Sequence, residues 1–160
     1  MKINKSTRHS KIAGDFGEML VLYWLSKYGF ECAKVDHTGI DLIAANPNTK
    51  KRMGISVKSR TRSLGSENEF IKLPISDFGK IDFACKSFGD LIPHFAIVVD
   101  AGDTIRVFIS STSHVLELFP MRNSGSGWRM TPEDLSRYTK DSEVIFFEFE
   151  SKHGRWWKSD

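Results

Sequence analysis

Two short apolar runs, each carrying an isolated ionisable residue, constrain the fold of this chain most strongly. The first, Gly39-Ile40-Asp41-Leu42-Ile43-Ala44, contains a single acid, and the second ends in Ser56-Val57-Lys58. Both have the composition of β-strands, in which side chains alternate between two faces. Ser56 and Lys58 therefore share a face, and a tight turn would bring Asp41 beside them. We expect a carboxylate suited to a hard cation and an ammonium suited to a phosphate or an attacking water to converge there.

The remaining patterns predict an α/β protein. A helical pattern over about residues 10–28 is too apolar for a solvated surface helix, so we expect it to be buried. Strands are expected at 30–35, 40–45, 51–58, 95–99, 105–109 and 144–149, helices at 75–88 and 111–118 and from Thr131, and loops at 59–69 and 123–127. No repeat or linker interrupts this order. We predict a single domain over residues 1–160 with a central mixed β-sheet flanked by helices, and a loose basic arm at residues 1–9.

The charge of the chain is distributed unevenly. The net charge is +3, but residues 1–62 carry twelve Lys/Arg against five Asp/Glu, and residues 63–160 carry eleven against fifteen. The basic half contains Asp41 and Lys58, and such asymmetry is typical of a face that meets a polyanion such as nucleic acid. A solvated, lysine-rich surface is the alternative.

Cysteine content and hydropathy indicate a reduced, cytoplasmic protein that is not exported. The two cysteines, Cys32 and Cys85, belong to no Cys-x-x-Cys or Cys/His cluster. No basic-then-apolar leader opens the chain, and no apolar run approaches the roughly 18 residues that a membrane helix needs. We expect no membrane partner.

With these elements placed, the chain resembles the PD-(D/E)XK nuclease superfamily, in particular its archaeal-resolvase-like and restriction-endonuclease-like members. In that superfamily an early helix carries a glutamate, the second core strand an acid, and the third an acid-x-lysine. The matching residues here are Glu18 in Gly-Asp-Phe-Gly-Glu, Asp41 in Gly-Ile-Asp-Leu and Lys58 in Ser-Val-Lys-Ser-Arg. The resemblance covers about residues 10–100 and implies a restriction-endonuclease-like fold.

The resemblance implies a metal-dependent endonuclease that hydrolyses phosphodiester bonds in DNA. Asp41, the Val57 carbonyl and Glu18 would hold Mg²⁺ or Mn²⁺, and Lys58 would orient the attacking water and balance charge on the phosphate. Arg60 and Arg62, just past the strand, would grip the nucleic-acid backbone. Symmetric dimers are common among enzymes that cut two strands, so a second copy of the chain is a candidate partner.

Ser56 departs from the superfamily pattern, because it stands where an acid or glutamine is usual. A neutral hydroxyl is a poor Mg²⁺ ligand. Some restriction enzymes of the superfamily are similar in having Ser-x-Lys with the acid moved to the following helix. The acids within reach by sequence are Glu67, Glu69, Asp77 and Asp82. The alternatives are a metal held by fewer charges, a migrated acid, or a catalytically weak or inactive nucleic-acid-binding module of the same fold.

Aromatic residues offer a further hypothesis about nucleic-acid contact. Trp128, Trp156 and Trp157 could stack on bases, although such residues more often cover the edge of a core.

Overall fold

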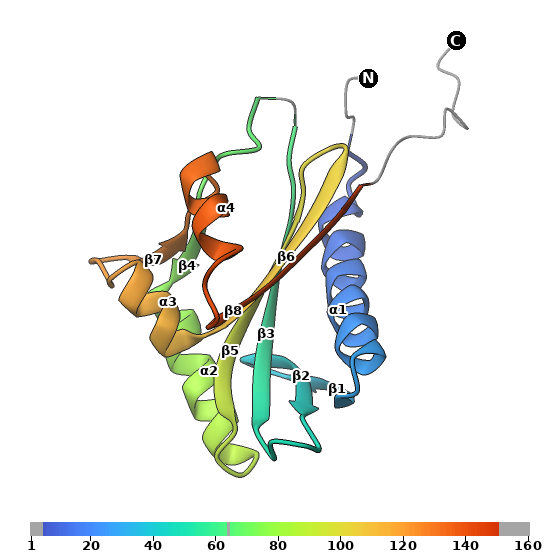
Figure 1. Cartoon of the computed structure of the whole chain (residues 1–160), viewed down its shortest axis with the longest axis vertical. Coiled ribbons are helices and arrows are strands. Elements are labelled where there is room, and N and C mark those ends of the chain that lie inside the picture. Colours follow the sequence, from blue (N-terminus) through green and yellow to red (C-terminus); the bar gives the residue numbers. More distant parts are fainter. Residues whose placement is uncertain (1–4, 64, 151–160) are drawn as a thin grey trace.

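A mixed six-stranded sheet forms the centre of the molecule (Figure 1), in the computed structural model that describes residues 5–63 and 65–150. The strand order is β1-β2-β3-β5-β6-β8, and only β3 and β5 run parallel. The strands are β1 (Glu31–His37), β2 (Ile40–Ala45), β3 (Arg52–Thr61), β5 (Ile92–Asp100), β6 (Thr104–Ser111) and β8 (Val144–Glu150). The predicted mixed sheet flanked by helices is confirmed.

The central strands are apolar on both faces because both faces are covered. In β5, Ala96 and Val98 belong to the core on one side of the sheet, and Phe95, Ile97 and Val99 to the core on the other. This continuous run explains why the position of β5 could be predicted from composition alone.

Helix α1 (His9–Lys27) covers one face of the sheet by itself. Val21 and Leu25 are buried against the sheet, whereas Phe16, Met19 and Tyr23 remain 46%, 52% and 59% exposed. The helix is thus buried against the sheet as expected, but part of its apolar stretch stays exposed. A lone helix on a sheet buries only the stripe that faces the strands, and nothing in the described part of the chain covers its outer side.

The opposite face is covered by helices α2 (Ile75–Ser87), α3 (Thr112–Leu118) and α4 (Pro132–Tyr138) and by a two-stranded ribbon of β4 (Ile71–Pro74) and β7 (Gly125–Trp128). Thr131 caps α4 by accepting a hydrogen bond from the Asp134 N–H, as its sequence predicts. Trp128 is fully buried in this core and stacks on Tyr138, so it has the core role that the sequence analysis considered more common and does not stack on bases. Trp156 and Trp157 lie outside the described residues.

The β4–β7 ribbon was missed by the sequence prediction, which assigned residues 123–127 to a loop. Gly125 has a φ of +133°, and a Cβ there would collide with the Leu73 carbonyl of the paired strand. The glycines that suggested a loop are required by close backbone packing within a strand pair.

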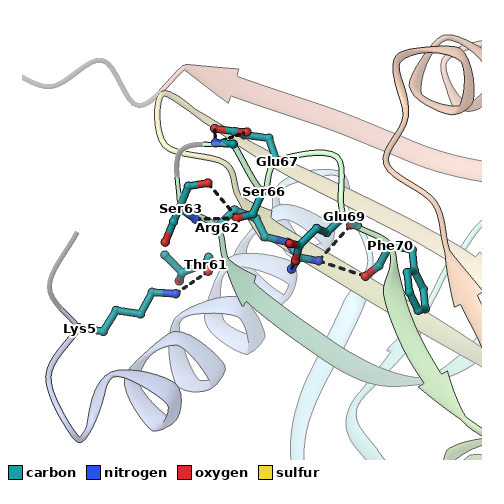
Figure 2. A network of polar contacts seen from close by, with 9 residues as sticks. Lys5, Thr61, Arg62, Ser63, Ser66, Glu67, Glu69 and Phe70 are labelled. Carbon is teal, nitrogen blue, oxygen red and sulfur yellow. Dashed lines mark hydrogen bonds and ion pairs between the residues drawn. The ribbon is translucent and has the colours of Figure 1, made fainter. Parts of the chain in front are cut away.

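The described part of the predicted arm is tied to the domain. Residues 1–4 lie outside the described residues, but the Lys5 ammonium donates a 2.7 Å hydrogen bond to the Thr61 carbonyl at the end of β3 (Figure 2). No helix in the described part of the chain is long and apolar enough to cross a membrane.

Candidate active site

The Asp41 carboxylate lies where β2 separates from β3. Paired residues of the two strands end at Leu42 and Ile55. One step further, the Val57 N–H donates a 2.6 Å hydrogen bond to Asp41 Oδ2 instead of to a backbone carbonyl. Because backbone N–H groups point along the sheet, the carboxylate lies at the β2-facing edge of β3.

Lys58 faces the α2 side of the sheet and meets an acid there. Its Nζ lies 3.0 Å from Asp77 Oδ2, in the first turn of α2, and the two side chains are only 24% and 20% exposed. Alternation along β3 puts Ser56 on the same side, where it is buried, and Val57 on the α1 side. The structure therefore brings Ser56 and Lys58 to one face, with Asp41 at its border.

Glu18 approaches from the other face, on α1. Its carboxylate forms a 2.8 Å ion pair with Lys34 of β1, a residue that the sequence analysis did not single out. The preceding residue, Gly17, explains the close approach of the helix, because a Cβ there would collide with the Ser59 hydroxyl on β3.

These charges act on Asp41 together. Burial raises the pKa of Asp41 above that of an ordinary aspartate, and the hydrogen bond from Val57 partly offsets the rise. Glu18 raises this pKa further, whereas Lys58 and Lys34 lower it. Asp41 thus lies between two ion pairs, Glu18–Lys34 and Lys58–Asp77.

The donors around Asp41 suit a hard cation such as Mg²⁺ or Mn²⁺. In an extended strand the N–H and C=O of one residue point to the same edge, so the Val57 carbonyl points towards the side where Asp41 lies. Carboxylate and carbonyl oxygens are the ligands that these ions prefer. In the part of the chain that the structure describes, no three acidic, histidine or cysteine side chains are grouped closely enough to enclose a metal. A cation here would keep several waters, as Mg²⁺ commonly does.

Of the four acids considered as replacements for the acid absent at position 56, Asp77 is the one paired with Lys58. Asp82 pairs with Lys86 on the exposed side of α2, Glu69 pairs with Arg62, and Glu67 accepts hydrogen bonds from the Gly65 N–H.

The two arginines beyond β3 have different surroundings. Arg60 is exposed, and its guanidinium contacts only the neighbouring Ser59 carbonyl among the described residues. The Arg62 side chain is only 13% exposed, and Figure 2 shows it reaching Glu69 and the Phe70 carbonyl. Its visible contacts hold the β3–β4 connection together, so a phosphate contact by Arg62 requires these bonds to open, whereas Arg60 can act directly.

A comparison with solved structures identifies a known fold that this chain resembles. The fold resembles that of a Holliday junction resolvase. One matching protein is Hjc from the archaeal hyperthermophile Archaeoglobus fulgidus, with a TM-score of 0.54; the match covers 72% of this chain and 88% of Hjc. The two sequences are only 16% identical, so the likeness concerns the fold, which is the restriction-endonuclease-like fold expected from the sequence.

Comparisons of sequence add no relative to this structural likeness. The amino-acid sequence matches no protein-family model and shows no significant similarity to a curated protein.

Proposed function

We propose that this protein is a metal-dependent nuclease that hydrolyses phosphodiester bonds in DNA. The observation that carries the proposal is a partly buried Asp41 carboxylate that accepts a hydrogen bond from the Val57 N–H of β3 and interacts electrostatically with Lys58 of the same strand. The likeness to a Holliday junction resolvase supports it through the fold.

In this proposal Asp41, the Val57 carbonyl and Glu18 hold Mg²⁺ or Mn²⁺. The bound cation would polarise the phosphate and lower the pKa of a coordinated water. Asp41 is kept in place by the Val57 N–H, and Lys34 holds Glu18 nearby. Lys58 positions the attacking water and balances the charge that develops on the phosphate oxygens.

We further propose that Asp77 takes the place of the acid that is absent at position 56. It arises from the helix that follows β4, and it already faces the catalytic lysine. In the absence of a cation it neutralises Lys58. A cation at Asp41 would compete with Lys58 for this carboxylate and release the lysine towards the substrate.

The proposal is tested by cleavage of single-stranded, duplex and branched DNA in Mg²⁺ or Mn²⁺, with and without chelator. We expect cation-dependent cleavage that Lys58→Ala and Asp41→Asn each reduce by about 100-fold or more, the size of the effect seen when one charge-stabilising group is removed from an active site. Lys86→Ala and Asp36→Asn are the matched controls, since both residues are exposed and lie outside the site. Equal rates in Lys58→Ala and wild type would contradict the assignment.

A second candidate function is a nucleic-acid-binding module of the same fold with weak or no turnover. The observation in its favour is that Ser56 supplies no charge and that Asp77 already neutralises Lys58. The same assay separates the two functions, because the module would bind DNA and leave it intact in every cation.

A further inference from the structure

A concave site lies over the β4–β7 ribbon and includes none of the proposed catalytic residues. We call it the ribbon pocket. Its volume is about 580 Å³, which is within the range of pockets that hold small ligands or nucleotides. Leu118, Phe119 and Pro120 provide an apolar wall, and Phe70, Lys72 and Arg129 are among the residues around it.

Strand alternation explains why these side chains gather there. Ile71, Leu73 and Trp128 point into the core, so the intervening positions of the ribbon point outward. Lys72 is paired with Gly127. A Cβ at Gly127 would come within 2.8 Å of the Phe70 ring, so the glycine leaves space for this ring against the ribbon. Phe70 is nevertheless 60% exposed.

The charge of the ribbon pocket is one-sided. Lys72, Arg122 and Arg129 line it, and no acid is among its lining residues in the described chain. None of the three forms an ion pair with another described residue. Two acids lie close in sequence to residues that line the pocket, but both have other partners. Glu69 pairs with Arg62, and Asp134 accepts a hydrogen bond from the Thr131 hydroxyl.

The cations are arranged around aromatic surface. The Arg129 guanidinium lies 5.4 Å from the centroid of the Phe119 ring, a cation–π contact that leaves its outer side available. Exposed cations beside an exposed aromatic ring are the two elements of sites that hold single-stranded nucleic acid, where cations contact phosphates and rings stack on bases. An apolar peptide would leave the three cations unpaired, and a free inorganic anion would not use Phe70.

We propose that the ribbon pocket binds an unpaired segment of the nucleic-acid substrate, with Phe70 stacking on a base and Lys72, Arg122 and Arg129 contacting phosphates. This inference deepens the proposed function and rests on it for the identity of the ligand. The pocket is joined to the candidate active site by a short segment. The carbonyl of Ser124, which lines the pocket, accepts a hydrogen bond from the N–H of Ile75, the first residue of α2. Asp77 lies two residues after Ile75 on the same helix.

The first test measures binding by fluorescence anisotropy in chelator, so that no cleavage occurs. The probes are a labelled oligothymidylate of about 12 nucleotides and a duplex of the same length. We expect Phe70→Ala to weaken oligothymidylate binding by about 10-fold, the loss of one stacked base, with a smaller effect on the duplex. Phe83→Ala is the control, because Phe83 is similarly exposed at 68% but lies on α2 outside the pocket.

The second test is the salt dependence of the same binding. Lys72→Ala/Arg122→Ala should reduce the slope of log K against log salt for the oligothymidylate by about 1.4, since each phosphate contact on a single strand contributes about 0.7. Lys27→Ala/Lys140→Ala removes the same charge from exposed positions outside the pocket and should leave the slope near that of wild type.

Three results would overturn the inference: no oligothymidylate binding by wild type, wild-type affinity in Phe70→Ala, or equal slope changes in the pocket and control double variants. Because binding is measured without a cation, these results are independent of nuclease activity. A wild-type protein that binds oligothymidylate through the pocket but cleaves nothing would refute the proposed nuclease and leave the pocket assignment intact.

Discussion

Gly14 and Gly17 lie one turn apart on α1 and have different surroundings. Nothing outside the helix lies within 4 Å of the position that a Cβ on Gly14 would occupy, whereas a Cβ on Gly17 would collide with the Ser59 hydroxyl and lie 3.5 Å from Val98. The amino-acid sequence does not distinguish these two glycines, because their difference depends on a strand about forty residues further along the chain.

Gly14→Ala should raise the free energy of unfolding by up to about 1 kcal/mol, because alanine is the better helix former. Gly17→Ala gains the same propensity but overfills the α1–β3 contact, so it should be less stable than Gly14→Ala by about 1–3 kcal/mol. Urea unfolding of both variants measures the difference. Gly17→Ala/Ser59→Ala should recover part of the loss, and identical stabilities of the two single variants would contradict the tight contact.

The pairing of Asp77 with Lys58 leads to a prediction about Ser56. Cation affinity rises with the number of carboxylates in a site. If Asp77 supplies the missing one, Asp77→Asn should weaken Mg²⁺ binding, and Ser56→Glu should restore it in that background. In the wild-type background Ser56→Glu would place like charges together, so affinity should stay level or fall.

Calorimetric Mg²⁺ titration of these variants decides the point, with Asp82→Asn as the control acid on the same helix. Tighter binding by Ser56→Glu alone would mean that the site lacks a carboxylate and that Asp77 serves only Lys58. Unchanged affinity in every variant would mean that neither Ser56 nor Asp77 faces the cation.

His114 of helix α3 pairs with Asp141, which lies in the segment just before β8. His114 Nε2 lies 2.9 Å from Asp141, and Nδ1 lies 2.9 Å from Glu117. Burial alone would lower the pKa of His114, but these two bonds raise it above its ordinary value, and the same contact lowers the pKa of Asp141.

The sign of the pH dependence follows from these shifts. A histidine whose pKa is raised by folding stabilises the protein most below its unfolded pKa, and this contribution is lost as the pH rises through the folded value. The stability difference between wild type and His114→Gln should therefore be largest near pH 5–6 and decline above about pH 6.5. Urea unfolding across pH measures it, and a difference that does not change with pH would contradict the ion pair.

The elements that the sequence predicted well are those whose pattern is set by burial on the sheet. The observed β2 coincides with the predicted strand at 40–45, and β5 was located by its apolar run. The β4–β7 ribbon was missed because its short strands are shaped by backbone contact at Gly125, which resembles a turn in composition.

For the candidate site, the sequence predicts what is local to one strand but not which side chains of different elements meet. Strand alternation groups Ser56 and Lys58 on one face, because it is a local property of one strand. The pairing of Lys58 with Asp77 and of Glu18 with Lys34 depends on how the two helices pack on opposite faces, and no spacing along the chain specifies those distances.

The described part of the molecule has two cores that share one sheet. Trp24 stacks on Phe147 on the α1 side, and Trp128 is buried on the α2 side. Strands β2, β5, β6 and β8 contribute side chains to both cores, so neither face can be exposed without weakening the other.

We therefore expect the chain to unfold as a single cooperative unit, as the predicted single domain requires. Urea transitions followed by tryptophan fluorescence and by far-UV circular dichroism should coincide. Two separated transitions would show instead that α1 and its core detach independently.

The parallel pairing of β3 with β5 also has a kinetic consequence. Strands β1 to β3 are joined by short turns, but β3 meets β5 only after residues 62–91 have crossed over, including the β4 strand and helix α2. The chain entropy of closing this connection must be lost before the central contacts are gained. The centre of the sheet thus depends on a sequence-distant contact, and the middle of the molecule, rather than its edges, is expected to set the rate at which a newly made chain reaches its native state.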